Sequence, residues 1–172
     1  MNEKIAILGL VEILSSLSCG LVILFITYRL VRVYGQKRLK IEHTNLAYNI
    51  ILAGVLFSVA YIMSGVIQPI TDSFRILSKS DVSNGQLVLQ FILYGGLFIA
   101  ISYLLAMLLV LAGIRIYSAM TPMNEAEEIR NNNVGVAIVL TTIIIILAIF
   151  CGSGINLLIE AFIPYPDVTH FK

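Results

Sequence analysis

Charged residues are scarce in this chain, and their scarcity decides its class. Only 12% of the 172 residues are charged, whereas 59% are hydrophobic. A soluble core of that size needs a polar surface around it, and this sequence has too few polar side chains to supply one. The lipid bilayer is therefore the expected surrounding medium and partner. The net charge of +1 also gives no basic field that would attract a nucleic acid.

Histidine and cysteine are equally rare, with two of each. His43 and His170 are predicted on opposite sides of the membrane, which excludes a bis-histidine haem or a metal site shared between them within one chain. Cys19 and Cys151 are both expected near the middle of the bilayer, as packing thiols rather than a disulfide. The G-x-S-x-G, H-E-x-x-H, P-loop and GxGxxG motifs are missing from the sequence. We therefore predict no enzyme activity, no cofactor and no metal.

Long apolar runs are what the chain has in abundance. Four of them cover residues 5–28, 46–70, 87–116 and 134–163. Each is longer than the roughly 20 residues with which a helix crosses hydrocarbon. Backbone groups in lipid must bond within their own segment, and no alternating pattern indicates a barrel. The predicted fold class is an all-α integral membrane protein with four transmembrane helices, the first retained rather than cleaved as a signal peptide.

Basic residues are distributed unequally between the linkers. The first linker carries Arg29, Arg32, Lys37, Arg38 and Lys40, and the third carries Arg115 and Arg130. The termini and the second linker together hold only Lys4, Arg75, Lys79 and Lys172. Because basic linkers stay in the cytoplasm, the first and third linkers are predicted inside and both termini outside.

An asparagine-led apolar segment occurs twice. The sequence IEHTNLAYNIILAG begins at Ile41 and IRNNNVGVAIVLTT begins at Ile129, with Asn45 and Asn133 in equivalent positions. This pattern predicts a duplicated two-helix unit, with residues 1–86 as the first membrane repeat and residues 87–172 as the second. An even number of crossings returns the chain to the same side, so the copies should be parallel and form a compact four-helix bundle.

The doubled I-x-x-x-N-[aliphatic]-[small] motif, preceded in its second copy by EAEE, suggests a family. It resembles the YjfL-like bacterial inner-membrane proteins, a domain of unknown function (350), over most of the chain. The resemblance implies duplicated two-helix units in a bacterial inner membrane, and it implies no activity.

The repeated asparagines have an expected local role. Asn45 and Asn133 are predicted to cap the second and fourth helices, by accepting a hydrogen bond from a first-turn amide. The alternatives are a polar contact between the repeats and a site lining a cytoplasmic vestibule. Asn49, one turn beyond Asn45, extends polar character into the cytoplasmic end of the second span, whereas its counterpart in the second repeat is Ala137.

Two further patterns predict local structure. Asn124 precedes Glu127 at capping-box spacing, which predicts a short helix running from Glu125 into the fourth span. Small residues four positions apart predict a packing face on each helix. These pairs are Ser16 and Gly20, Gly54 and Ser58, Gly96 and Ala100, and Gly152 and Asn156.

Polar side chains inside the spans are the best candidates for function, because an ionised group in hydrocarbon costs roughly 2.5 to 3.5 kcal/mol on insertion scales. Glu12 and Asn156 are both predicted about 10 Å deep from the outer surface. Glu160 lies one turn beyond Asn156 on the same face, so the three residues form a candidate intramembrane polar cluster. The alternative is that Glu12 is protonated or reaches water, and that a neighbouring helix satisfies Asn156.

Two functions follow from these features. The first is a component of an oligomeric channel or transporter, either a homo-oligomer or part of a membrane-protein complex. Its permeation path would lie at the contacts between subunits. The alternative is a structural or membrane-stress partner that recruits other proteins through its charged cytoplasmic linkers.

Overall fold

The protein is all-helical over the residues described by the computed structural model, which are 3–42, 44–67, 69–70 and 84–162. The helices are α1 (Glu3–Arg38), α2 (Leu46–Ser64), α4 (Asn84–Met120), α5 (Glu125–Arg130) and α6 (Val134–Glu160). No strand occurs in these residues, so the predicted all-α class is confirmed.

Four of the helices are long and apolar enough to cross a membrane. Their candidate spans are Ser16–Arg38, Leu46–Ser64, Ile92–Met120 and Val134–Glu160. These correspond in order to the four apolar runs of the sequence, so the prediction of a multi-pass membrane protein with four spanning helices is confirmed.

The first helix is longer than its apolar run. We expected the span to end near Tyr28, but α1 continues through the basic linker to Arg38. Arginine and lysine are good helix formers, and Lys37 and Arg38 lie in the last turn, where the helix dipole favours positive charge. The chain leaves the helix at Lys40, which has a left-handed φ of 52°.

The short helix α5 does not run into the fourth span, so that prediction is wrong. It is capped by Asn124, whose side-chain oxygen accepts from the Glu127 amide at 3.4 Å, and it ends at Arg130. Asn132 then takes a left-handed φ of 62°, which a continuous right-handed helix does not permit. A new helix, α6, begins at Val134.

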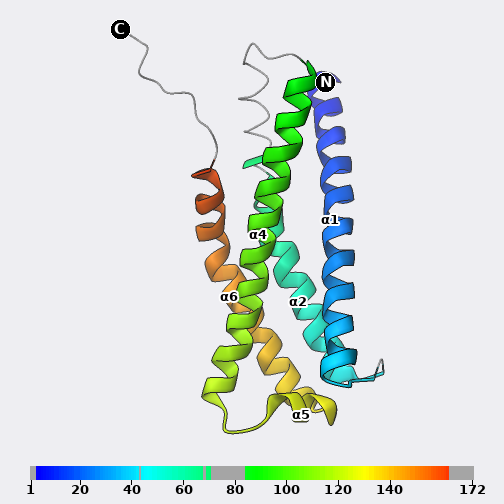
Figure 1. The fold of residues 1–172 in the computed structure, drawn as a ribbon, viewed down its shortest axis with the longest axis vertical. Coiled ribbons are helices and arrows are strands. Elements are labelled where there is room, and N and C mark those ends of the chain that lie inside the picture. Colours follow the sequence, from blue (N-terminus) through cyan, green and yellow to red (C-terminus); the bar gives the residue numbers. More distant parts are fainter. Residues whose placement is uncertain (1–2, 43, 68, 71–83, 163–172) are drawn as a thin grey trace.

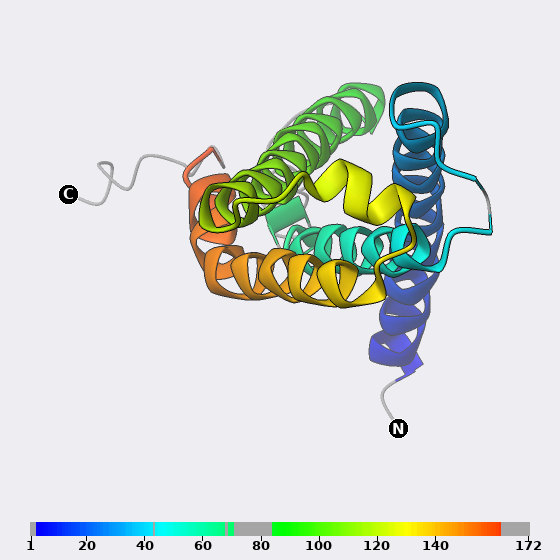
Figure 2. The same ribbon diagram turned by 90° about the horizontal axis from the view of Figure 1, so that it is seen from below.

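Helix α2 is at the centre of the molecule, beside α6 (Figures 1 and 2). The two helices run in the same direction, and α4 covers both of them while running the opposite way. Within the most apolar stretch of each span, 56% of α2 is buried inside the protein, compared with 28% of α4 and of α6 and 11% of α1. The core therefore lies between α2, α4 and α6.

Small residues set the close contact between α2 and α6. A Cβ atom at Gly54 would collide with Thr141 Cγ2, and one at Gly152 would lie 2.9 Å from Tyr61 Cε1. The predicted packing faces of α2 and α6 are therefore real contacts, as expected for helices that approach through small residues. The predicted packing face on α4 makes no such contact. Gly96 and Ala100 are exposed, and a Cβ at Gly96 would meet no atom within 4 Å.

Helix α1 lies at the edge of the core. It packs mainly along α2, where the Tyr48 hydroxyl donates to the Val31 carbonyl. It reaches α4 through Thr27, whose hydroxyl lies 3.3 Å from the Tyr103 hydroxyl. Helix α4 packs on both α2 and α6, whereas α1 packs mainly on α2. The first helix of the second predicted repeat is therefore packed more closely than the first helix of the first repeat. The bundle is accordingly more open than the compact four-helix bundle that we expected.

Candidate functional site

Asn45 joins the two halves of the chain at the end of the bundle that carries α5. Its side-chain oxygen accepts from the Tyr48 amide at 2.7 Å and so caps α2. Its side-chain nitrogen donates to the Ile129 carbonyl at 2.7 Å and to the Arg130 carbonyl at 3.2 Å. The side chain is buried, so it is both a helix cap and a polar contact between segments far apart in the sequence.

Asn132 completes this connection from the opposite side. Its side-chain oxygen accepts from the Ala47 amide at 2.9 Å, in the first turn of α2. The left-handed backbone of Asn132, with φ 62°, is one that asparagine adopts more readily than most residues. Sequence reasoning missed this role, although the run of three asparagines was a signal for a turn.

Asn133 occupies the position equivalent to Asn45 but has a more local role. Its oxygen accepts from the Val136 amide at 3.3 Å and caps α6. Its nitrogen donates to Glu128 Oε2 at 2.7 Å, within the same half of the chain. The side chain is exposed. We call Asn45, Asn132 and Asn133 the asparagine junction; it is a structural joint rather than a pair of equivalent sites.

Two acidic residues of α5 accept hydrogen bonds from side chains nearby in the sequence. Glu125 accepts from the Thr121 hydroxyl at 2.7 Å and from the Ser118 hydroxyl at 2.9 Å. The bond from Thr121 is the main reason that the pKa of Glu125 is lowered below its ordinary value. Glu128 is the acceptor for Asn133. These bonds fix the linker between α4 and α6.

A second group of polar side chains lies inside the membrane-spanning part. Among the described residues, some side-chain oxygens there are buried and have no hydrogen-bond partner, and we call the residues named next the polar seam. They are Ser58 on α2, Ser102 on α4, and Thr141 and Asn156 on α6. Ser58 is 1% exposed and Ser102 is 0% exposed, so neither hydroxyl can reach bulk water.

Other hydroxyls in the spans behave differently from those of the seam. Thr27 and Thr142 each donate at 2.8 Å to the carbonyl four residues earlier in their own helix. That bond is the usual way for a hydroxyl to be satisfied in an apolar helix. A buried hydroxyl without a partner costs about 1 to 3 kcal/mol, so the seam oxygens require another partner, such as an ordered water molecule.

The seam follows the contact between α2 and α6. Thr141 packs against Gly54, and the Asn156 amide packs against Gly65, where no Cβ would fit. A rise of about 1.5 Å per residue puts these two levels of α2 about 16 Å apart, roughly half of a hydrocarbon core about 30 Å thick. Ser58 lies between them on α2. Ser102 is on a buried stripe of α4, because Phe98 and Ala106, one turn to either side of it, are also 0% exposed.

The predicted outer polar cluster is only partly described. Asn156 is half-buried beside α2, and Glu160 is half-buried in the last turn of α6. Glu12 belongs to α1, but its side chain lies outside the described residues. Helices α1 and α6 are on different sides of α2 in both ribbon views (Figures 1 and 2). The cluster therefore stays a prediction.

The remaining candidates are not members of the seam, or they lie outside the described residues. Asn49 is half-buried one turn above the α2 cap, and its counterpart Ala137 is fully buried. Cys19 and Cys151 are free thiols, on α1 and α6. His43 and His170 both lie outside the described residues. Among the described residues, no three histidine, cysteine, aspartate or glutamate side chains come together as metal ligands would.

The helices and their polar contacts define a class, which is a multi-pass, all-helical membrane protein. The chain matches the family described as Domain of Unknown Function (DUF350) over residues 5–155, and it belongs to that family. The resemblance found in the sequence is therefore confirmed. No curated protein and no solved structure matches the chain.

Proposed function

We propose that the protein is a subunit of an oligomeric membrane channel or transporter that conducts protons along water held by the polar seam. The observation that carries this proposal is the set of four buried oxygens without partners in the α2, α4 and α6 core. Hydroxyls both donate and accept hydrogen bonds, so they can extend a file of water molecules. The seam residues are all neutral, and a bare ion there would lack a compensating charge.

Helix α1 supports the oligomeric part of the proposal. Only 11% of its most apolar stretch is buried inside the chain, and Leu14, Leu17 and Phe25 are each more than half exposed. A second copy of the chain at this face would bury α1 and would bring more helices around the path.

The proposed location is a bacterial inner membrane, with both termini outside the cytoplasm. The support for this orientation is the concentration of basic residues at the end of the molecule that carries α5. Arg32, Lys37 and Arg38 lie in the final turns of α1, and Arg130 ends α5. Basic residues near span ends are retained in the cytoplasm.

The alternative role, recruitment of partner proteins through charged linkers, has less support. It uses the basic first linker and the acidic third linker, and in the third linker Glu125 and Glu128 already accept hydrogen bonds from Thr121 and Asn133, which leaves the exposed Glu127. We therefore favour transport over a scaffold.

A matched pair of neighbouring threonines tests the transport proposal. Thr141→Val removes a buried, unpartnered hydroxyl and keeps the side-chain shape, whereas Thr142→Val removes an exposed hydroxyl that is bonded to its own helix. Proton flux into liposomes would be followed with an enclosed pH-sensitive dye and a potassium diffusion potential. Loss of one stabilising hydrogen bond along the path should slow the flux of Thr141→Val about tenfold. The flux of Thr142→Val should equal that of the parent.

Thr141→Ser serves as a rescue, because it keeps the hydroxyl and loses only a methyl group. It should retain most of the parental flux. Equal flux for Thr141→Val and Thr142→Val, or no protein-dependent flux above that of empty liposomes, would reject the proposed path.

A further inference from the structure

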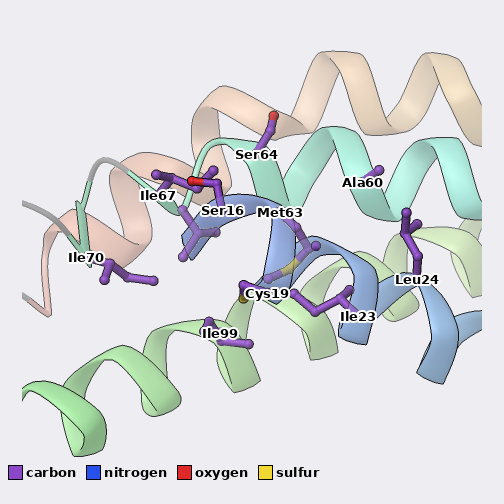
Figure 3. A pocket seen from close by; sticks show the side chains of 12 residues that line it. Ser16, Cys19, Ile23, Leu24, Ala60, Met63, Ser64, Ile67, Ile70 and Ile99 are labelled. Atoms are coloured by element: carbon purple, nitrogen blue, oxygen red, sulfur yellow. The ribbon is translucent and has the colours of Figure 1, made fainter. Parts of the chain in front are cut away.

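A cavity between α1, α2 and α4 lies apart from the polar seam. It has a volume of about 170 Å³. Figure 3 shows Ser16, Cys19 and Ile23 of α1 facing Met63 of α2, with Ile99 of α4 on another side. The cavity extends past the last residue of α2, Ser64, as far as Ile70, so it is close to the end of the bundle at which α2 stops.

The chemistry of the lining selects an apolar occupant. Most of the lining side chains are aliphatic, and the polar atoms come from Ser16, Ser64 and the Cys19 thiol. Ser64 already donates its hydroxyl proton to the Tyr61 carbonyl at 2.7 Å. A water molecule needs two to four polar partners, and apolar cavities of about 150 Å³ stay dry and accept small hydrocarbons.

The surroundings of the cavity select the kind of hydrocarbon. The cavity lies inside the membrane-spanning part and is partly open. On α1, the neighbouring residues Leu17 and Leu21 are 58% and 60% exposed, so the cavity adjoins an apolar surface that lipid tails reach wherever a second chain does not cover it. Gly20 lines the cavity and has no side chain to fill it, and a Cβ at this position would meet no atom within 4 Å.

From this geometry we propose that the cavity is a binding site for a short segment of one acyl chain of a phospholipid, taken from the leaflet at which α2 ends. The acyl chain fills the space that Gly20 leaves between α1 and α2. It therefore forms part of the contact that holds α1, the least buried span, against the core. This site is independent of the proposed proton path.

The test uses the purified protein in nanodiscs that contain a phospholipid with a photoreactive diazirine on one acyl chain. Cross-linked peptides would be mapped by mass spectrometry. We expect labelling to concentrate on the lining residues of α1 and α2, around Cys19 and Met63. Gly20→Phe fills the cavity, and it should reduce that labelling about tenfold, equivalent to about 1.4 kcal/mol of binding.

Gly96→Phe is the matched control, because Gly96 is also helical with open space at its Cβ position but does not line the cavity. Its labelling around Cys19 and Met63 should equal that of the parent. Gly20→Val, a smaller filling change, replaces Gly20→Phe if the larger variant does not fold, and it should reduce labelling in the same direction.

Three results would overturn the proposal. One is labelling of the lining residues that Gly20→Phe and Gly20→Val leave unchanged. Another is labelling spread evenly over exposed residues such as Leu17 and Leu21, without enrichment in the cavity. The third is a protein-to-protein cross-link at Cys19 in place of lipid, which would make a second copy of the chain the occupant.

Discussion

Two asparagines in equivalent sequence positions have different surroundings in this protein. Asn45 is buried and bonds to a segment more than eighty residues away, whereas Asn133 is exposed and bonds to Glu128 nearby. Both cap a helix, but only Asn45 also connects the two halves. The difference arises because the Ile129 and Arg130 carbonyls at the end of α5 lie within reach of the Asn45 nitrogen, whereas the Asn133 nitrogen meets the Glu128 carboxylate.

This difference predicts unequal effects of the same substitution. Asn45→Ala removes a cap and leaves the Ile129 and Arg130 carbonyls without their donor, so it should lower the free energy of unfolding by about 2 to 4 kcal/mol. Asn133→Ala should cost about 1 kcal/mol, a typical value for an exposed cap. Unfolding in mixed SDS micelles, followed by circular dichroism, would measure both. Equal costs would contradict the bridging role of Asn45.

The limits of sequence reasoning are visible at these residues. The caps could be predicted, because an asparagine directly before an apolar run is a local signal. The bonds from Asn45 to Ile129 and from Asn132 to Ala47 could not, because they depend on how α5 folds back over α2. Likewise, Ser58 was expected only as a small packing residue. Its missing hydrogen bond depends on the neighbouring helices, which one sequence does not specify.

At the scale of helices, α2 is the element on which the others depend. It contacts α1, α4, α5 and α6, and the glycines of its α6 face permit the closest approach. Hydropathy and length predicted the number and order of the spans correctly, since both are properties of a single segment, but the first candidate span is Ser16–Arg38 instead of residues 5–28. They did not predict that α1 would continue to Arg38, because a helix can extend beyond its apolar run into water.

The contact between Gly54 and Thr141 gives a prediction at this scale. Gly54→Ala places a Cβ against Thr141 Cγ2 and should destabilise the protein by about 1 to 3 kcal/mol. Thr141→Ser removes that methyl group, so the double variant should recover most of the loss. SDS unfolding of the two single variants and the double variant forms a double-mutant cycle.

Gly96→Ala is the control, since open space surrounds that position and alanine favours helix. It should be neutral or slightly stabilising. Simple additivity of Gly54→Ala and Thr141→Ser would show that the collision does not set the distance between α2 and α6.

At the scale of the whole molecule, a tightly packed core of three helices lies beside one loosely attached helix. The core buries polar oxygens that find no partner within it, and α1 exposes apolar side chains to its surroundings. Water in the seam would supply the missing hydrogen bonds, and a second chain would cover α1. The transport proposal accounts for both features in one assembly, while the acyl-chain site accounts for the space left beside α1.

The most direct test of this account is a cryo-electron microscopy map of the protein in lipid nanodiscs, at a resolution that reveals ordered water. We expect an oligomer with α1 at the contacts between chains, and water density beside Ser58, Ser102 and Thr141. A single chain with a dry core, in which these hydroxyls donate to carbonyls of their own helices, would contradict it.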